Sequence, residues 1–144
     1  MVHQIHVDER QARIHQRLTG FLSRAEAEAV RDHVAAACRR IGAPRALTML
    51  ADLSDYPPQS QDVSGIGVDI AAFIAAAAPA GFAIVTGSAL QRVRLRRVMD
   101  AARPRFFETA AAAAADLGWE PALLTAISSR GTPPFATPLG GSPR

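Results

Sequence analysis

Residues 46–78 read ALTMLADLSDYPPQSQDVSGIGVDIAAFIAAAA, and three successive patterns in this stretch decide the fold. Residues 46–53 form a short, almost wholly apolar run, which is typical of a central strand covered on both faces. A polar loop with two prolines follows. From Asp62 onward apolar residues recur at helical spacing, and five of them share one side of the predicted helix: Ile66, Ile70, Phe73, Ile74 and Ala77. A buried strand that leads into an amphipathic helix predicts a βαβ arrangement in a parallel sheet.

Residues 3–7 and 12–18 predict a β-hairpin, because apolar and polar residues alternate on both sides of the polar turn 8–11. The expected facing pairs are Val7 with Ala12, Ile5 with Ile14, and His3 with Gln16. In this register His6 and His15 share one face as diagonal neighbours. The outer edge of the hairpin could pair with a second copy of the chain and form a homodimer.

Ser23 and Glu26 have the spacing of a capping box, in which each side chain accepts a hydrogen bond from a free backbone N–H at a helix start. The helix is expected to end at Gly42. Residues at spacings of three and four are expected to be buried: Ala27, Val30, Val34, Ala37, Cys38 and Ile41. Cys38 is the only cysteine, which excludes a disulfide within the chain and fits a buried, unreactive thiol.

The rest of the chain continues to alternate strands and helices. Further strands are expected at 82–87 and 104–107, and further helices at 89–102 and 108–119. Ser88 would cap the first of these helices, and Trp119 would anchor the end of the second in the core. Residues 128–144 are rich in proline and glycine and have little to bury, which predicts a disordered tail.

The predicted order is therefore β-β-α-β-α-β-α-β-α, in one domain over residues 1–127. This alternation favours an α/β fold with a mixed, largely parallel sheet and helices packed on it. The first strand would run antiparallel to its neighbour at one side of the sheet.

All 16 basic residues of the 144-residue chain are arginine, and the net charge is only +3. The absence of lysine excludes a P-loop lysine, a Schiff base and a lysine general base. The small net charge gives no indication of nucleic-acid binding. No signal peptide is visible, and the longest apolar stretch, 71–85, is too short to span a bilayer. A cytoplasmic protein without a membrane span is expected.

Three segments carry a resemblance to a known family: RLTGFLSRAEAEAV (17–30), LADLSDYPPQSQDVSGIGV (50–68) and TGSALQRVRLRRVMDAA (86–102). Their order and spacing resemble the STAS domain of anti-sigma-factor antagonists, the SpoIIAA-like proteins, over about residues 2–119. The resemblance implies a non-enzymatic regulatory module that binds an anti-sigma factor. That partner is often a serine kinase, which phosphorylates the first serine of Asp-Ser-Ser-Gly in this family.

In this chain Val63 occupies the position of the usual phosphoacceptor, and Ser64 matches the second serine of the motif. The chain is therefore similar to a divergent, STAS/SEC14-like branch that lacks the usual acceptor. Ser64 is the remaining candidate for phosphorylation. By the resemblance, the contact surface for a protein partner would centre on Asp55, Tyr56, Asp62, Ser64, Gly65 and Gly67. Tyr56, the only tyrosine, would be its anchor.

A phosphate on Ser64 is chemically reasonable, because free backbone N–H groups and the helix dipole favour negative charge at a helix start. The alternative is that Asp62 or Ser64 only caps the helix. In that case Gly65 and Gly67 would allow the helix to pack closely against the sheet.

A second candidate site lies after the strand at 82–87, because open α/β sheets bind ligands at the carboxyl ends of their strands. The residues expected to bind an anion or ligand are Gly87, Ser88, Arg92 and Arg96, while Leu90, Val93, Val98 and Ala101 would point inward. The alternative is an ordinary solvated helix surface. The many alanines at 71–78 and 110–115 could leave room for a small apolar ligand, such as a lipid with its headgroup near the arginines, or could only allow close packing.

No set of residues predicts catalysis or a metal site. His6 and His15 lack a third ligand, and no nucleophile or base can be paired with Asp52 and Asp55 at the end of their strand. Asp55, which precedes Tyr-Pro-Pro, also suits a turn. We therefore expect no catalytic residue, metal or cofactor. Two functions are favoured: regulation through a protein partner, and binding of a small apolar molecule. An enzyme that uses Asp52 or Asp55 is the third and least favoured alternative.

Overall fold

The computed structural model describes residues 2–41, 46–78, 80–99, 103–120 and 137–138. In chain order the elements are β1 Val2–Asp8, β2 Arg13–Thr19, α1 Arg24–Ile41, β3 Thr48–Asp52, α2 Gln61–Ala77, β4 Gly81–Val85, α3 Ala89–Val98, β5 Arg105–Phe107, α4 Ala110–Asp116 and β6 Thr137–Pro138. The predicted order of the first nine elements is confirmed. Apart from the two residues of β6, the predicted tail lies outside the described residues.

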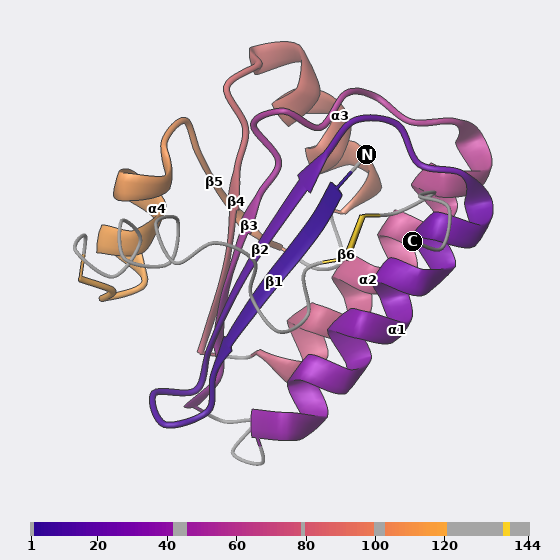
Figure 1. Ribbon diagram of the computed structural model, residues 1–144. Helices are drawn as coiled ribbons and strands as arrows, with labels where there is room; N and C mark the ends of the chain where they lie inside the picture. Colours follow the sequence, from indigo (N-terminus) through magenta and orange to yellow (C-terminus); the bar gives the residue numbers. More distant parts are fainter. Residues whose placement is uncertain (1, 42–45, 79, 100–102, 121–136, 139–144) are drawn as a thin grey trace.

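The strands form one sheet in the order β5-β4-β3-β2-β1-β6 (Figure 1). β2, β3, β4 and β5 pair in parallel, whereas β1 runs antiparallel to both β2 and β6. The predicted α/β fold, with a mixed sheet and an antiparallel first strand, is confirmed. β6 pairs with Val2 and His3, on the hairpin edge where we expect a possible homodimer contact.

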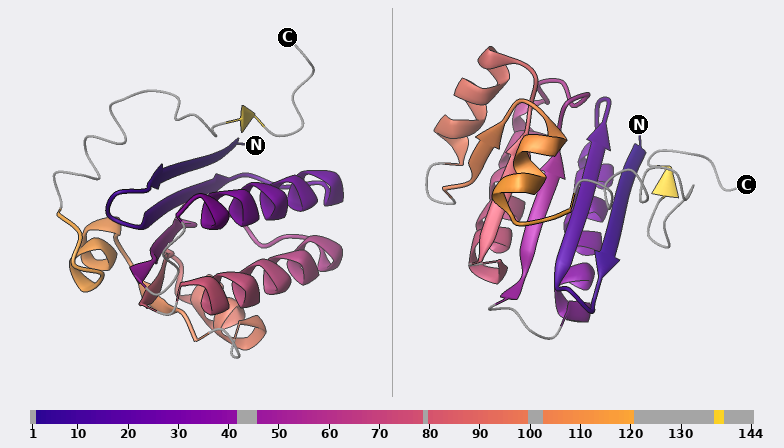
Figure 2. Two further views of the ribbon diagram at one scale, coloured as in Figure 1. Left: turned by 90° about the horizontal axis from the view of Figure 1, so that it is seen from below. Right: turned by 90° about the vertical axis from the view of Figure 1, so that its left-hand side faces the viewer.

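The helices lie on both faces of the sheet. Three successive crossovers, through α1, α2 and α3, each move by one strand in the same direction. Because such crossovers are right-handed, these three helices belong to one face. Figure 2 shows α4 on the opposite face from α1 and α2. Leu95 of α3 accordingly packs in the core of α1 and α2, while Ala113 and Ala114 of α4 pack in a second, smaller core.

The hairpin register differs from the prediction by two residues. Val7 faces Ile14, Ile5 faces Gln16, and His3 faces Leu18. The cause is the turn, which occupies 9–12 and places Ala12 in the left-handed region at a φ of 53°. The side-chain period of two keeps the predicted residues on the inner face. His6 therefore lies directly opposite His15 instead of diagonal to it.

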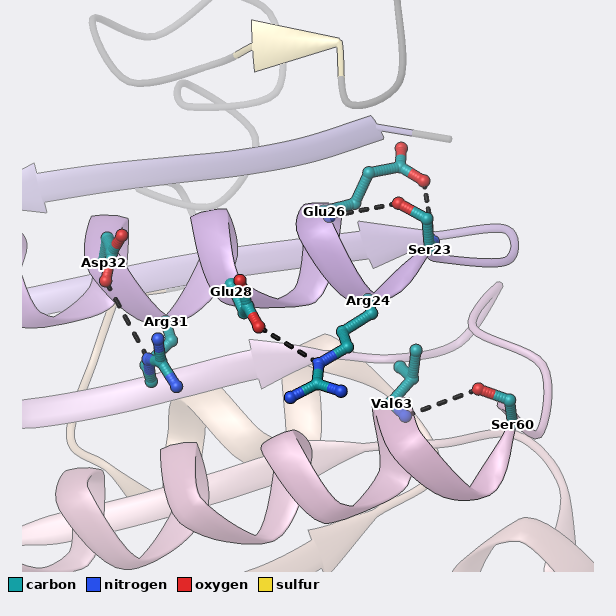
Figure 3. Close-up of polar contacts among 8 residues, drawn as sticks. All are labelled: Ser23, Arg24, Glu26, Glu28, Arg31, Asp32, Ser60 and Val63. Carbon is teal, nitrogen blue, oxygen red and sulfur yellow. Dashed lines mark hydrogen bonds and ion pairs between the residues drawn. The ribbon is translucent and has the colours of Figure 1, made fainter.

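α1 begins as its sequence predicts. The backbone N–H of Glu26 donates to Ser23 Oγ at 3.1 Å, and the backbone N–H of Ser23 donates to Glu26 Oε1 at 2.7 Å (Figure 3). Five of the six residues predicted to be buried on this helix are buried: Ala27, Val30, Val34, Ala37 and Ile41. Cys38 is half-buried against the same core, and burial raises the pKa of its thiol.

The inward side of α2 is rotated slightly from the prediction. Its buried residues are Val63, Ala71 and Ile74. Phe73 was expected inside but is 43% exposed. Because consecutive helical residues are about 100° apart around the axis, the neighbour of a fully inward Ile74 necessarily turns toward solvent.

The second core is closed by Trp119, as predicted. Its ring is buried with Leu50, Ala83, Val85 and the alanines of α4. The indole Nε1–H donates to Thr48 Oγ1 at 2.9 Å. This hydrogen bond satisfies the polar atom of a large buried ring, so the end of α4 is fixed to β3.

Candidate functional site

The N-cap of α2 lies two residues before Asp62, the first position where a cap was expected. Ser60 is the N-cap, and its Oγ accepts from the backbone N–H of Val63 at 3.4 Å (Figure 3). The backbone N–H of Ser64 donates to the carbonyl oxygen of Ser60 at 2.8 Å. The prediction that Asp62 or Ser64 caps the helix is therefore wrong. Asp62 lies in the first turn, where the helix dipole favours a carboxylate. Ser64 directly follows Val63, whose backbone N–H donates to the Ser60 cap.

Gly65 and Gly67 do not serve close packing against the sheet, which corrects the second part of that interpretation. A Cβ atom placed on either glycine would meet no atom within 4 Å. Gly65 is exposed, whereas Gly67 is half-buried and borders a cavity.

Gln59 holds the loop before α2 in place, a role that the sequence did not predict. Its Oε1 accepts from the backbone N–H of Leu22 at 2.8 Å, and its Nε2 donates to the carbonyl oxygen of Gly20 at 3.1 Å. The backbone N–H of Gly20 also donates to the carbonyl oxygen of Asp55 at 3.1 Å. Arg17 pairs with the Asp55 carboxylate at 2.7 Å. The loop is thus bonded to the β2–α1 connection.

A cavity of about 350 Å³, partly open to solvent, lies under this loop, between the sheet and the helices α1, α2 and α3. Its walls are mostly apolar and come from six elements and the loop. The apolar lining residues include Leu18, Val30, Ala51, Leu53, Val63, Ile70, Ala71, Ile74, Phe82, Ile84, Leu95 and Met99. Pockets that bind small molecules typically measure about 300–1,000 Å³ and are lined in this way.

Two buried glutamines bring polar atoms to the cavity wall. Gln91 is 7% exposed, and its Nε2 donates to the carbonyl oxygen of Tyr56 at 3.4 Å. Gln16 belongs to β2 and lines the cavity from the sheet side. Its Nε2 is 3.1 Å from Nε2 of His3. Because an amide nitrogen only donates, His3 Nε2 accepts and its proton is on Nδ1.

His3 connects this wall to α1. Its Nδ1 lies 3.4 Å from Nδ1 of His33, and the two rings stack with centroids 5.5 Å apart. His3 is fully buried. Burial, and secondarily the neighbouring His33, lower the pKa of His3 to about 4, so the ring is neutral at pH 7.

The six residues predicted to bind a protein partner fall on two sides of their segment. Tyr56, Ser64 and Gly67 line the cavity, and burial raises the pKa of Tyr56 to about 12. Asp55, Asp62 and Gly65 are exposed. The segment therefore has an inner side on the cavity and an outer side toward solvent.

The second predicted site is not brought together on the cavity. Ser88 caps α3 as predicted, its Oγ accepting from the backbone N–H of Gln91 at 3.2 Å, and Gly87 is exposed beside it. Arg92 pairs with Glu108 at 3.2 Å. The guanidinium carbon of Arg96 lies 5.4 Å from the centroid of the Phe106 ring.

Two other arginines of α3, Arg94 and Arg97, line the cavity instead. The cause is the rotation of α3, whose inward residues are Gln91 and Leu95. Leu90 and Val93, which were expected inside, are 62% and 55% exposed. The side chain of Val98 and the position of Ala101 lie outside what the structure describes.

The remaining candidates do not form a reactive set. Asp52 Oδ1 accepts from both the backbone N–H and the hydroxyl of Ser54, which is a turn contact. Burial lowers the pKa of His15, against an opposing effect of Asp52. Among the described residues, no three His, Cys, Asp or Glu side chains lie together as metal ligands do.

The chain matches no protein-family model, and it matches no curated protein. In the part of the chain that the structure describes, none of the helices combines the length and the apolar character needed to cross a membrane.

Proposed function

We propose that this chain is a non-enzymatic, STAS-like α/β domain that binds a small apolar or amphipathic molecule in the cavity between its sheet and helices. The observation that carries the proposal is the size of the cavity, about 350 Å³. Clefts of this size, with mostly apolar walls and a few polar groups, are typical of sites that bind small molecules.

The walls suit an apolar occupant. Small side chains such as Ala71 and Ala51, together with Gly67, leave the space open, while Ile74, Leu95 and other large residues surround it. An occupant would remove its own apolar surface and that of the walls from water, which stabilises the complex by about 25 cal/mol per Å².

The STAS assignment is supported by the position of the three resembling segments. They form the connections that follow β2, β3 and β4, and two of these connections border the cavity. The β3–α2 connection, which borders the cavity, leads into the part of the chain that matches the phosphorylated motif of STAS domains.

Ligand binding is tested with a matched pair of glycine variants. Gly67→Leu fills the cavity, whereas Gly65→Leu adds the same side chain to exposed helix two residues away. The wild type is expected to bind the apolar fluorophore N-phenylnaphthylamine and to retain a ligand in native mass spectrometry. Gly67→Leu should weaken fluorophore binding at least ~10-fold, because the leucine occupies the site, and Gly65→Leu should not. A wild type that binds no fluorophore and shows a clean apo mass contradicts the proposal.

A second function, regulation through a protein partner, is favoured by the two-sided segment described above. Tyr56, Ser64 and Gly67 line the cavity, while Asp55 and Asp62 face solvent on the same segment. A ligand that presses on the inner side can therefore alter the outer surface. Regulated phosphorylation of Ser64 would place charge in the cavity wall.

The partner proposal is tested by pull-down from the native host with wild type, Asp62→Arg and Ser64→Asp. Asp62→Arg changes only the exposed side, so it should remove the partner without changing fluorophore binding. Ser64→Asp should weaken fluorophore binding, because it places a carboxylate at an apolar wall. The proposal fails if wild type and Asp62→Arg retain the same proteins.

A further inference from the structure

The charged residues of the cavity are all of one sign. Among the lining residues that the structure describes, Arg94 and Arg97, both exposed, are the only charged side chains, and there is no aspartate or glutamate. Neither arginine takes part in an ion pair within the described residues. Their neighbours on α3 differ, because Arg92 pairs with Glu108 and Arg96 stacks on Phe106.

Arg94 and Arg97 are placed to act together. Residues three apart on a helix have Cβ atoms about 5–6 Å apart on one side, so two guanidinium groups can reach one small anion. Guanidinium binds carboxylate and phosphate through paired hydrogen bonds. The surrounding walls are apolar, so the rest of such a ligand would be an aliphatic chain.

We propose that the occupant of the cavity is an anionic amphiphile, with an aliphatic chain in the apolar interior and a carboxylate or phosphate head held between Arg94 and Arg97. This proposal rests on the proposed ligand-binding function. It disfavours a cationic head, since the described lining residues carry two positive charges and no negative one.

Ligands that share a ten-carbon chain and differ in their head test the proposal. Decanoate, decyl phosphate, decanol and decyltrimethylammonium are titrated against the bound fluorophore, with inorganic phosphate as a head without a chain. In the wild type, decanoate or decyl phosphate should bind at least ~10-fold tighter than decanol, because hydrogen bonds to charged groups contribute more than neutral ones. The stronger of the two anions identifies the head as carboxylate or phosphate. Decyltrimethylammonium should bind no better than decanol, and inorganic phosphate should not displace the fluorophore.

The variant Arg94→Gln with Arg97→Gln should bind decanoate and decanol equally, while still binding the fluorophore. Arg96→Gln is the matched control, because it removes an exposed arginine of the same helix that does not line the cavity. It should keep the preference for the anion.

Two outcomes overturn the inference and leave ligand binding intact. One is equal affinity of the wild type for decanol and both anions. The other is loss of the preference in Arg96→Gln to the same extent as in the double variant, which would indicate a general charge effect. If neither the fluorophore nor any ten-carbon compound binds to the wild type, the proposed function itself fails.

Discussion

The two faces of the sheet use alanine-rich helices with opposite results. On one face the alanines of α4 pack closely, and Trp119 fills the remaining space beside Leu50. On the other face α2 is also rich in alanine, but a cavity of about 350 Å³ remains beside it. Small side chains alone therefore do not create a cavity. What matters is whether a large side chain occupies the space that they leave.

Glycines show the same contrast. A Cβ atom on Gly81, next to α4, would meet Leu117 Cδ2 at 2.8 Å, whereas one on Gly67 would meet nothing within 4 Å. Leu117, at the end of α4, therefore packs directly against Gly81. On the α2 face, no side chain packs against Gly67 in this way. This comparison predicts different costs for changes on the two faces.

The greatest loss of stability is predicted for a change on the packed face. Trp119→Ala should lower the free energy of unfolding by about 3–5 kcal/mol, because it removes a large buried ring and leaves a cavity. Thr48→Val is the control, since it removes only the acceptor of the indole N–H and should cost about 1 kcal/mol. Urea unfolding measures both. A cost for Trp119→Ala no greater than that for Thr48→Val would show that the α4 face is not closely packed.

The next effect concerns the buried polar groups behind the cavity. The pKa of His3 is about 4 in the folded chain against 6.5 in the unfolded chain. Between these values the unfolded state binds more protons, so stability is full above pH 6.5 and is lost as the pH falls toward 4. The pKa difference corresponds to about 3 kcal/mol between pH 7 and pH 4.

Urea unfolding of the wild type and His3→Leu from pH 7 to pH 4 measures this loss. The variant should be less stable at pH 7, because Gln16 loses its acceptor, but its stability should change less with pH. Identical pH profiles would show that His3 is not the group responsible.

The sequence predicted the fold because its signals are local. Strand alternation, the Ser23–Glu26 capping box and the Ser88 cap of α3 involve residues within one turn of each other. The α2 start was misplaced because several polar residues in a row can each cap, and the contacts of Gln59 with Gly20 and Leu22, which fix the loop, are distant in sequence.

The arginines at the cavity could not be predicted for a related reason. The pattern of α3 favoured burial of Leu90 and Val93, yet the helix buries Gln91 and Leu95. Its rotation is fixed by tertiary contacts, including the bond from Gln91 to the carbonyl of Tyr56 and the Arg92–Glu108 pair. The rotation of α3 decides which of its arginines border the cavity. Arg94 and Arg97 border it, whereas Arg92 and Arg96, which were predicted to bind a ligand, do not.

A smaller effect tests the helix starts on the two faces. Ser60→Ala on α2 and Thr109→Ala on α4 each remove a side chain that accepts from a backbone N–H, and each should cost about 1 kcal/mol. Ser64→Ala should cost clearly less, because Ser64 is not the cap. Chemical denaturation of the three variants measures these values. A cost for Ser64→Ala equal to that for Ser60→Ala would restore Ser64 as a structural residue of the helix start.

The smallest effect separates the faces by glycine. Gly67→Ala and Gly65→Ala should each stabilise the protein by about 0.5–1 kcal/mol, because alanine favours the helix and its methyl group enters open space. Gly81→Ala should give no such gain, since its methyl group forces Leu117 to move. Thermal unfolding measures all three. If Gly67→Ala destabilises while Gly65→Ala stabilises, then side chains close over the space beside Gly67, and the contrast between the two faces does not hold.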